Sequence, residues 1–357
     1  MRLPRRRWLI LIGLSIAIKL FSLFPAAVER YYSSGFYPVI SSLLRFLLGW
    51  IPFSVGDILY VLAGIWLLRA LVRFLRMLLR KQLNRQVFLS ILRRTGLGAL
   101  MIYIIFNLFW GLNYNRVPMM KTLGLDASPF TTAELRQLTE IIISRTNSFD
   151  SSGRPGRKML SRKRYLFNEA IETYRLAGLS DPKLSYRPSS VKPSLFSYAG
   201  NYLGFTGYYN PFSGEAQSNT TVPAFVQPFT TCHEIGHQLG YAKENEANFA
   251  GFLSAGHSEN PAFQYSLYFD MLSYSLREMQ LRDSLQAKEL KAKLNPGVLA
   301  DFLELKQFYR RYDNLIEPVI RVLYSHYLRA NDQPQGMKTY NQVVAMMVAY
   351  YRRYGKI

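Results

Sequence analysis

Two of the chain's four histidines, His233 and His237, lie four positions apart in the stretch "HEIGH", with Glu234 directly after the first. On an α-helix, positions i and i+4 project from the same face, so both imidazoles can reach one metal ion at about 2.0–2.1 Å. Glu234 would then abut a water molecule at the metal, where a carboxylate can take up a proton and later release it. The same five residues also fit an ordinary buried helix that contains two structural histidines.

A catalytic zinc site usually has three protein ligands and one open position, so a third ligand is expected nearby. The candidates are Glu244 and Glu246 in "KENEANFAGF", which has a helical pattern of its own. Gly240 in the connecting "GYAK" is a natural end for the first helix, so two helices would fold back on each other. Positions i and i+2 diverge by about 200° on a helix, so only one of the two glutamates can face the metal.

The order "HEIGH" and then "ENEANFAGFL" resembles the glutamate zincins, a class of zinc peptidases whose second helix carries E-x-x-A-D or E-x-x-A-N. The resemblance implies that Glu244 is the third zinc ligand. It also implies that Asn248 supports a zinc-binding histidine through a hydrogen bond, which fixes the orientation of the ring. Glu246 would then be a packing or solvent-facing residue. The chain departs from most of these enzymes in the short gap of six residues between His237 and Glu244.

Hydrolysis of a carbonyl compound also needs a donor for the transition-state oxyanion besides the metal. His257, in the loop "AGHSEN", and Tyr265 and Tyr268 beyond it are candidates, although an exposed loop histidine is the plainer interpretation of His257. We expect His326 to be a packing residue. Cys232, the only cysteine, is expected to be a small apolar filler, and a single cysteine excludes a disulfide within the chain.

The segment 183–226 has short aromatic and β-branched runs broken by Pro, Gly and Asn, which predicts a small antiparallel sheet of two to four strands. Within it, 204–219 is either an edge strand that accepts an extended peptide or a plain structural hairpin, with Asn210 and Pro211 in its turn. Glu215 is expected to be a polar turn carboxylate rather than a further ligand.

Amphipathic spacing predicts that the rest of the chain after residue 113 is mainly helical. The expected helices are 132–145, "KRYLFNEAIETYRLAG" ending at Gly178, 261–290, 296–327 and 337–354. Residues 114–357 are therefore predicted to form an α+β, helix-dominated domain with the sheet just ahead of the histidine helix.

The formal net charge of +21 is concentrated in residues 1–113, which hold fifteen basic and two acidic residues and are also strongly apolar. This composition indicates a membrane region rather than a nucleic-acid surface. The predicted spans are 8–24, 55–72 and 97–113, with two or four as alternatives. Lys19 weakens the first span, which also fits a secretory signal peptide. The segment 36–52 is expected to be an interfacial or re-entrant helix.

Eight Lys or Arg and no acid lie between Arg69 and Arg94, and the N-terminus is basic as well. Basic loops favour the cytoplasmic side, so three spans would put residues 114–357 on the outer side of the membrane. The alternative for this charge run is a nucleic-acid patch, which its position between apolar spans disfavours. The expected partners are thus the lipid bilayer and a peptide or protein substrate, with no nucleic acid.

Nearly the whole layout resembles an uncharacterised bacterial membrane family, domain-of-unknown-function family 3810, in "GYYNPFSGEAQSN", "PFTTCHEIGHQLG" and "ENEANF". This resemblance implies a multi-pass bacterial membrane protein. With the orientation that the basic loops favour, we expect it in the inner (cytoplasmic) membrane with its second domain on the periplasmic side. The expected function is zinc-dependent peptide hydrolysis. The alternatives are a non-hydrolytic zinc-containing receptor or envelope scaffold, and a membrane protein without metal.

Overall fold

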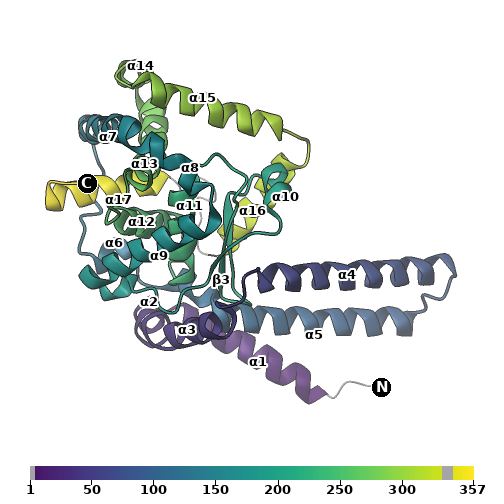
Figure 1. The fold of residues 1–357 in the computed structure, drawn as a ribbon. Helices are drawn as coiled ribbons and strands as arrows, with labels where there is room; N and C mark the ends of the chain where they lie inside the picture. The colour runs from purple at the N-terminus through teal and green to yellow at the C-terminus, as the bar shows by residue number, and fades with distance from the viewer. Residues whose placement is uncertain (1–4, 332–340) are drawn as a thin grey trace.

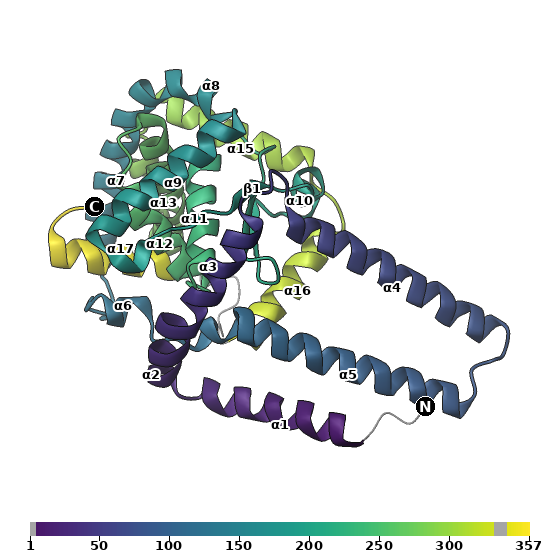
Figure 2. The same cartoon turned by 60° about the horizontal axis from the view of Figure 1, so that its bottom comes forward.

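The computed structural model describes residues 5–331 and 341–357. Three long helices project from a globular body in one direction, α1 (Arg5–Ser22), α4 (Val55–Leu79) and α5 (Arg85–Phe109) (Figure 1). The start of α1 and the turn between α4 and α5 lie at the same end, away from the body (Figure 2). If all three helices cross the membrane, this arrangement puts the basic N-terminus and the basic turn between α4 and α5 on the same side of it.

Helices α4 and α5 are each long and apolar enough to cross a membrane, and they contain the predicted spans 55–72 and most of 97–113. α1 is long and apolar enough to cross a membrane only when it is joined to Pro25–Leu48, from which it is bent by 97°. The described residues therefore give two candidate spans, or three if the two helices of the bent pair form one span. The last span ends at Phe109 rather than at residue 113, because Gly111–Asn115 forms a 3-10 helix, η2.

Side-chain caps start both spans. The Ser54 hydroxyl accepts a hydrogen bond from the backbone N–H of Asp57 at 3.0 Å, and the Asn84 side chain accepts one from Val87 at 2.9 Å. No residue in the most apolar stretch of α4 is buried within the molecule. Apolar surface of that extent is unfavourable in water and favourable in lipid, so the structure agrees with a membrane protein.

The segment between α1 and α4 packs on the body. It contains α2 (Pro25–Ala27), a π-helix η1 (Val28–Phe36) and α3 (Tyr37–Leu48). Tyr37 donates a hydrogen bond to the carbonyl of Gln238 at 2.8 Å, and Glu29 forms an ion pair with Arg116 at 2.9 Å. The predicted helix at 36–52 therefore exists as α3, and it lies against the end of the histidine helix.

The body is mainly helical, as predicted. α7 (Thr132–Gly153) begins with a capping box between Thr131 and Glu134, and it packs on α13 (Pro261–Arg282) in the core. The predicted helix 261–290 is broken at Asp283, whose side chain caps α14. The other helices are α6 (Met119–Thr122), η3 (Arg154–Gly156), α8 (Arg157–Leu160), α9 (Lys163–Ser180), η4 (Pro182–Leu184), α10 (Ser197–Leu203), α14 (Ser284–Lys291), α15 (Pro296–Arg311), α16 (Glu317–Ala330) and α17 (Asn341–Tyr354).

Several helices differ in extent from the sequence prediction. α7 continues to Gly153, beyond the predicted end at residue 145. α9 continues to Ser180, two residues beyond Gly178. The predicted helix 296–327 is two helices, α15 and α16, separated by a turn around Asn314, whose side chain accepts a hydrogen bond from the backbone of Ile316 at 2.7 Å. For the last helix, residues 337–340 of the predicted 337–354 lie outside the described residues.

The sheet has three strands in the order β1-β3-β2, namely β1 (Val191–Pro193), β2 (Gly207–Asn210) and β3 (Glu215–Ser218). β2 and β3 form the expected antiparallel hairpin, whereas β1 pairs with β3 in parallel. The prediction of an antiparallel sheet was therefore wrong, and the sheet is mixed. The reason is α10, which carries the chain from β1 across to the far edge, so that β3 returns beside β1 in the same direction.

Candidate metal centre

The stretch that contains "HEIGH" folds as two helices, α11 (Gln227–Gln238) and α12 (Glu244–Ala255), which pack against each other. Gly240 separates them with a φ of +91°, a backbone conformation that residues with a Cβ rarely adopt. A Cβ at this glycine would also lie 2.9 Å from the ring of Tyr37 on α3. The predicted chain reversal at "GYAK" is thus confirmed.

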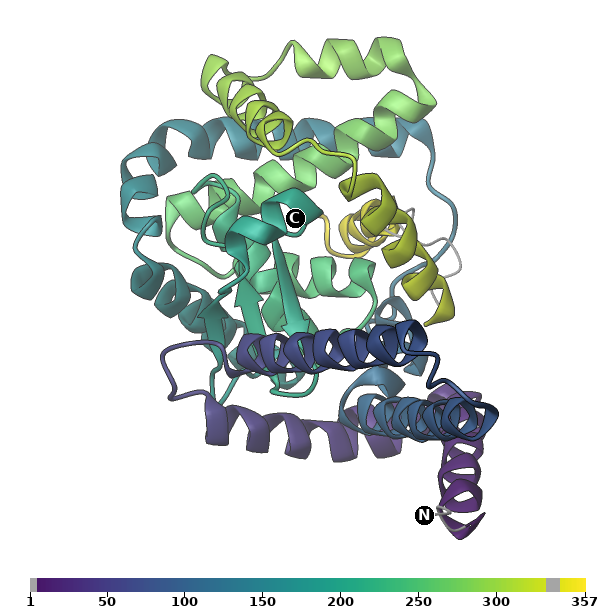
Figure 3. The ribbon, with the colours of Figure 1, turned by 90° about the vertical axis from the view of Figure 1, so that its right-hand side faces the viewer.

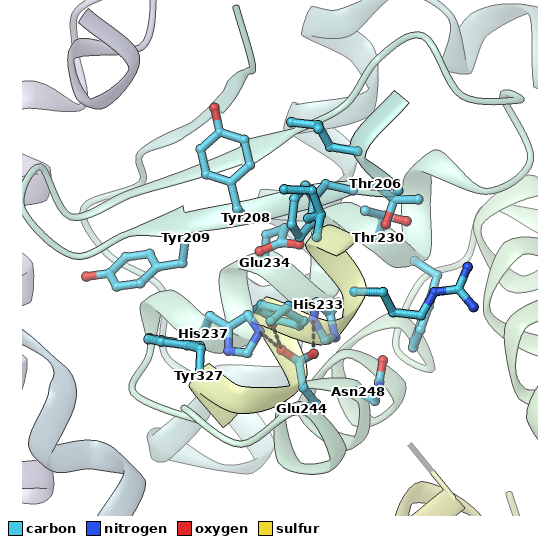
Figure 4. A pocket seen from close by; sticks show the side chains of 18 of the residues that line it. Thr206, Tyr208, Tyr209, Thr230, His233, Glu234, His237, Glu244, Asn248 and Tyr327 are labelled. Atoms are coloured by element: carbon cyan, nitrogen blue, oxygen red, sulfur yellow. Dashed lines mark hydrogen bonds and ion pairs between the residues drawn. The ribbon is translucent and has the colours of Figure 1, made fainter. Parts of the chain in front are cut away.

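Four side chains from the two helices meet in one cavity (Figure 4). His233, Glu234 and His237 each offer an atom within 4.8 Å of the others. From α12, Glu244 approaches both rings, with Oε2 at 3.4 Å from Nε2 of His233 and Oε1 at 3.8 Å from Nε2 of His237. All four residues that the sequence predicted for the metal and the base therefore lie together.

The hydrogen bond of His237 indicates which ring nitrogen faces the cavity as an acceptor. Its Nδ1 lies 2.8 Å from the carbonyl oxygen of Tyr241, and since a carbonyl can only accept, Nδ1 carries the proton. In the neutral ring Nε2 then has a free lone pair directed at Glu244. A lone pair and a carboxylate facing each other need a cation between them, either a proton or a metal ion. The donors thus fit Zn²⁺, which binds imidazole nitrogen and carboxylate oxygen.

Electrostatics supports a charged carboxylate at this point. Burial by itself would raise the pKa of Glu244, but the contacts with His233 and His237 outweigh it and hold the pKa well below its ordinary value. For His237, burial lowers the pKa, yet the facing Glu244 raises it more, so the net shift is upward. Both shifts show that Glu244 favours positive charge at the two imidazoles.

Glu234 is in a different environment. Its pKa is raised to about 7, mainly because the carboxyl is buried, with Glu244 adding to the rise and the two histidines opposing it. One of its oxygens, Oε2, has no hydrogen-bond partner among the described residues. Glu234 lies under strand β2, where a Cβ built on Gly207 would come within 2.6 Å of Oε1. The glycine therefore leaves the room that this carboxylate occupies.

Asn248 lines the same cavity, next to Glu244 (Figure 4). Its Oδ1 accepts a hydrogen bond of 3.5 Å from Tyr274, and no bond joins it to His233 within the described parts of the chain. Nδ1 of His233 and Nδ2 of Asn248 are both buried, and neither has a partner among the described residues. The hydrogen bond expected for Asn248 is thus not formed in this structure. Sequence reasoning did not find Tyr241, whose carbonyl orients the other ring.

The three candidates for an oxyanion donor do not line the cavity. His257 is exposed, and its Nδ1 lies 2.8 Å from the carbonyl of Leu253. Tyr265 donates to Asp301, and Tyr268 donates to the carbonyl of Ile357 at 3.2 Å. The structure does not bring these residues to the site, because the buried Tyr265 contacts Asp301 of α15 and the buried Tyr268 stacks on Phe149 of α7.

Other tyrosines line the cavity instead, and sequence reasoning missed them because they come from distant elements. They include Tyr208 and Tyr209 on β2, Tyr274 on α13, and Tyr324 and Tyr327 on α16. The hydroxyl of Tyr324 lies 2.5 Å from Oε1 of Glu244 and donates to it. The only sequence signal for this role was the aromatic spacing of "RVLYSHYLRA", from which α16 turns Tyr324 and Tyr327 toward the cavity.

Four further predictions have clear outcomes. Cys232 is buried, as expected. Glu246 is a packing residue rather than solvent-facing, because it is buried and accepts the backbone N–H of Met119 at 2.8 Å. Glu215 is not a turn carboxylate, since it is fully buried and pairs with Lys192 at 2.5 Å. His326 is exposed beside Arg329, so the packing role expected for it was wrong.

The fold and site together define a helix-dominated protein with two membrane-length helices and a buried cluster of two histidines and two glutamates. Residues 32–348 match the family described as "Protein of unknown function (DUF3810)". The chain belongs to this family. No curated protein matches the sequence, and no solved structure matches the fold.

Proposed function

We propose that this protein is a membrane-anchored, zinc-dependent peptidase. The observation that carries the proposal is the position of Glu244, whose two carboxylate oxygens face Nε2 of His233 and of His237 at 3.4 and 3.8 Å. These three residues would hold Zn²⁺ and leave a position open toward the cavity. When bound, zinc would polarise the substrate carbonyl and make water a stronger nucleophile at neutral pH.

Glu234 supplies the proton transfers of the proposed reaction. It is the remaining carboxylate of the cluster, and a pKa of about 7 suits a group that must both accept and release a proton near neutral pH. It takes a proton from the attacking water and delivers it to the amine that leaves when the peptide C–N bond breaks. A purely structural zinc site would have no use for this carboxylate, which favours an enzyme over a scaffold.

The cavity has room for a peptide. Its volume is about 550 Å³, and one wall is formed by Gly207 and Tyr208 of strand β2 with Thr206 directly before it. β2 is an edge strand of the sheet, paired only with β3 among the described strands, and an extended peptide can add to such an edge through main-chain hydrogen bonds. The carbonyl of the bound peptide would then lie above Glu234.

For the location, the basic turn between α4 and α5 supports a cytoplasmic position of that end. The globular body, at the opposite ends of these helices, would then be on the outer side of a bacterial inner membrane. Peptide or protein segments on that side are the proposed substrates.

Metal analysis and hydrolysis of a peptide library by the purified full chain test the proposal. We expect zinc in the wild type, loss of zinc in His233→Ala, and retention of zinc in Glu234→Gln with a rate lower by about 10²–10⁴-fold. A wild type that binds no zinc would refute the metal site. Zinc binding with equal rates for wild type and Glu234→Gln would refute the catalytic role and favour a non-hydrolytic zinc protein.

A further inference from the structure

Helix α16 presents an apolar face to the outside of the body. Its inner side, with Ile320 and Tyr324, lines the cavity of the metal cluster. Its outer side carries exposed apolar residues at helical spacing, which are Ile316, Val319, Val322 and Leu323. Val319 and Val322 are 57% and 55% exposed. A helix on the surface of a water-soluble domain normally turns its apolar stripe to the core, so this outward stripe needs a partner.

The neighbouring helix α10 continues the same face. Tyr198 and Tyr202 on α10 are exposed, as is Leu195 just before it. α10 is a neighbour of α16 and is also joined to the turn before it, because Asn314 donates a hydrogen bond to the carbonyl of Tyr202 at 2.8 Å and the rings of Tyr202 and Tyr312 meet edge to face. We call the exposed apolar residues of α10 and α16, with Leu195, the α10–α16 face.

The α10–α16 face is on the side of the body from which the two membrane-length helices leave. Figure 3 looks at the molecule from that side, and α16 (yellow-green) lies in front, above α4. Figure 1 likewise has α10 and α16 on the side of the body from which α4 projects. An apolar surface in this orientation faces the plane in which the lipid headgroups around α4 and α5 would lie.

Contacts near the start of α4 and after the end of α5 fix the depth of this face. Asp57, in the first turn of α4, accepts the backbone N–H of Leu195 at 2.7 Å, directly before α10. After α5, Tyr114 donates to the hydroxyl of Tyr327 on α16 at 3.3 Å. The face is therefore level with the ends of both spans, which is where the membrane interface begins. Tyrosine side chains are typical of that zone.

We propose that the α10–α16 face is inserted in the interfacial layer of the lipid bilayer, as a surface additional to the spans themselves. α16 would then separate lipid on its outer side from the metal cluster on its inner side. A consequence, which rests on the proposed function, is that substrates are peptide segments held close to the membrane surface. The docking itself depends on neither zinc nor hydrolysis.

A fluorescent thiol label tests the proposal on the full chain in nanodiscs of phosphatidylcholine and phosphatidylglycerol. Val319→Cys and Val322→Cys carry an environment-sensitive probe. Leu285→Cys is the matched control, since Leu285 is 74% exposed and its helix α14 lies far from α4 (Figure 1). The native Cys232 is buried, and burial raises the pKa of its thiol, so the wild type gives the unlabelled background.

We expect blue-shifted emission at Val319 and Val322, with quenching by lipids spin-labelled near the headgroup, several-fold stronger than at Leu285. Emission and quenching equal to those at Leu285 would overturn the proposal. A blue shift without lipid quenching would overturn it as well, because it would mean that protein, such as a second copy of this chain, covers the face. Two labelled positions on one helix guard against a local effect of either substitution.

Discussion

Gly207 of strand β2 lies against Glu234 of helix α11 so closely that a methyl group on its α-carbon would come within 2.6 Å of Oε1 and 2.9 Å of the carbonyl of Gln217. The side chain of Glu234 can move, but the backbone of β3 cannot move as easily. Residue 207 therefore has to be glycine if the proposed base is to remain under the edge strand where a peptide would bind.

The first prediction follows from this contact. Gly207→Ala should displace the Glu234 carboxylate and lower the rate of peptide hydrolysis by about 10²-fold, the cost of misplacing a reacting group by roughly 1 Å. Zinc content should not change, because His233, His237 and Glu244 lie on α11 and α12 rather than on β2. Gly64→Ala is the control, since an added Cβ there meets nothing within 4 Å. Equal rates for Gly207→Ala and the control would contradict the prediction.

The second prediction separates the two glutamates of α12. Glu244→Gln should weaken zinc binding by about 100-fold or more, because losing a ligand costs at least as much as losing its supporting hydrogen bond. Glu246→Gln should bind zinc normally, since the amide oxygen can still accept from Met119 and Glu246 does not line the cavity. Competition with a chromophoric chelator measures both affinities. The assignment fails if Glu246→Gln is the variant that loses zinc.

How far the sequence predicted this centre depends on how local each contact is. Two histidines one turn apart and the break at Gly240 are local features, and both were predicted. The choice of Glu244 needed a family resemblance, because spacing alone admits Glu246 as well. Tyr324 was missed, since it reaches Glu244 from a helix 80 positions later in the chain, and the aromatic spacing around it does not say which residue it contacts.

The fold has the same limit. Capping residues and amphipathic spacing predicted most helices, with errors at their ends. The parallel pairing of β1 was not predictable, because a three-residue strand that contains Pro193 has little pattern of its own. The packing of α3 depends on Tyr37 and Arg45 reaching residues near position 238 and at Pro188, far along the chain. The sequence therefore predicted an interfacial or re-entrant helix here, but not the contacts that hold α3 on the body.

A third prediction concerns Asp270, which lines the cavity on α13 and has a pKa raised to about 7 by burial. Unfolded, this carboxyl ionises near 3.8, so between pH 4 and 7 folding takes up a proton and stability falls as pH rises. Asp270→Asn should match the wild type at pH 4 and be more stable at pH 8. The gain in the free energy of unfolding is at most about 4 kcal/mol, because each unit of pKa difference contributes about 1.4 kcal/mol. Urea unfolding in detergent with zinc removed measures this. A difference that does not depend on pH would refute it.

The fourth prediction concerns the buried pair that fastens α4 to the sheet. Lys192 of β1 contacts Glu215 of β3 at 2.5 Å and donates to the carbonyl of Leu48, while Glu215 accepts the backbone N–H of Gly56 at 2.6 Å. Lys192→Met leaves a buried carboxylate without its cation, which typically costs about 3–5 kcal/mol. Urea unfolding in detergent, followed by tryptophan fluorescence, should show this loss.

Arg175→Met, which removes an exposed ion pair with Glu172, is the control and should have no measurable effect. If both variants unfold at the same urea concentration as the wild type, the pair does not hold α4 to the body.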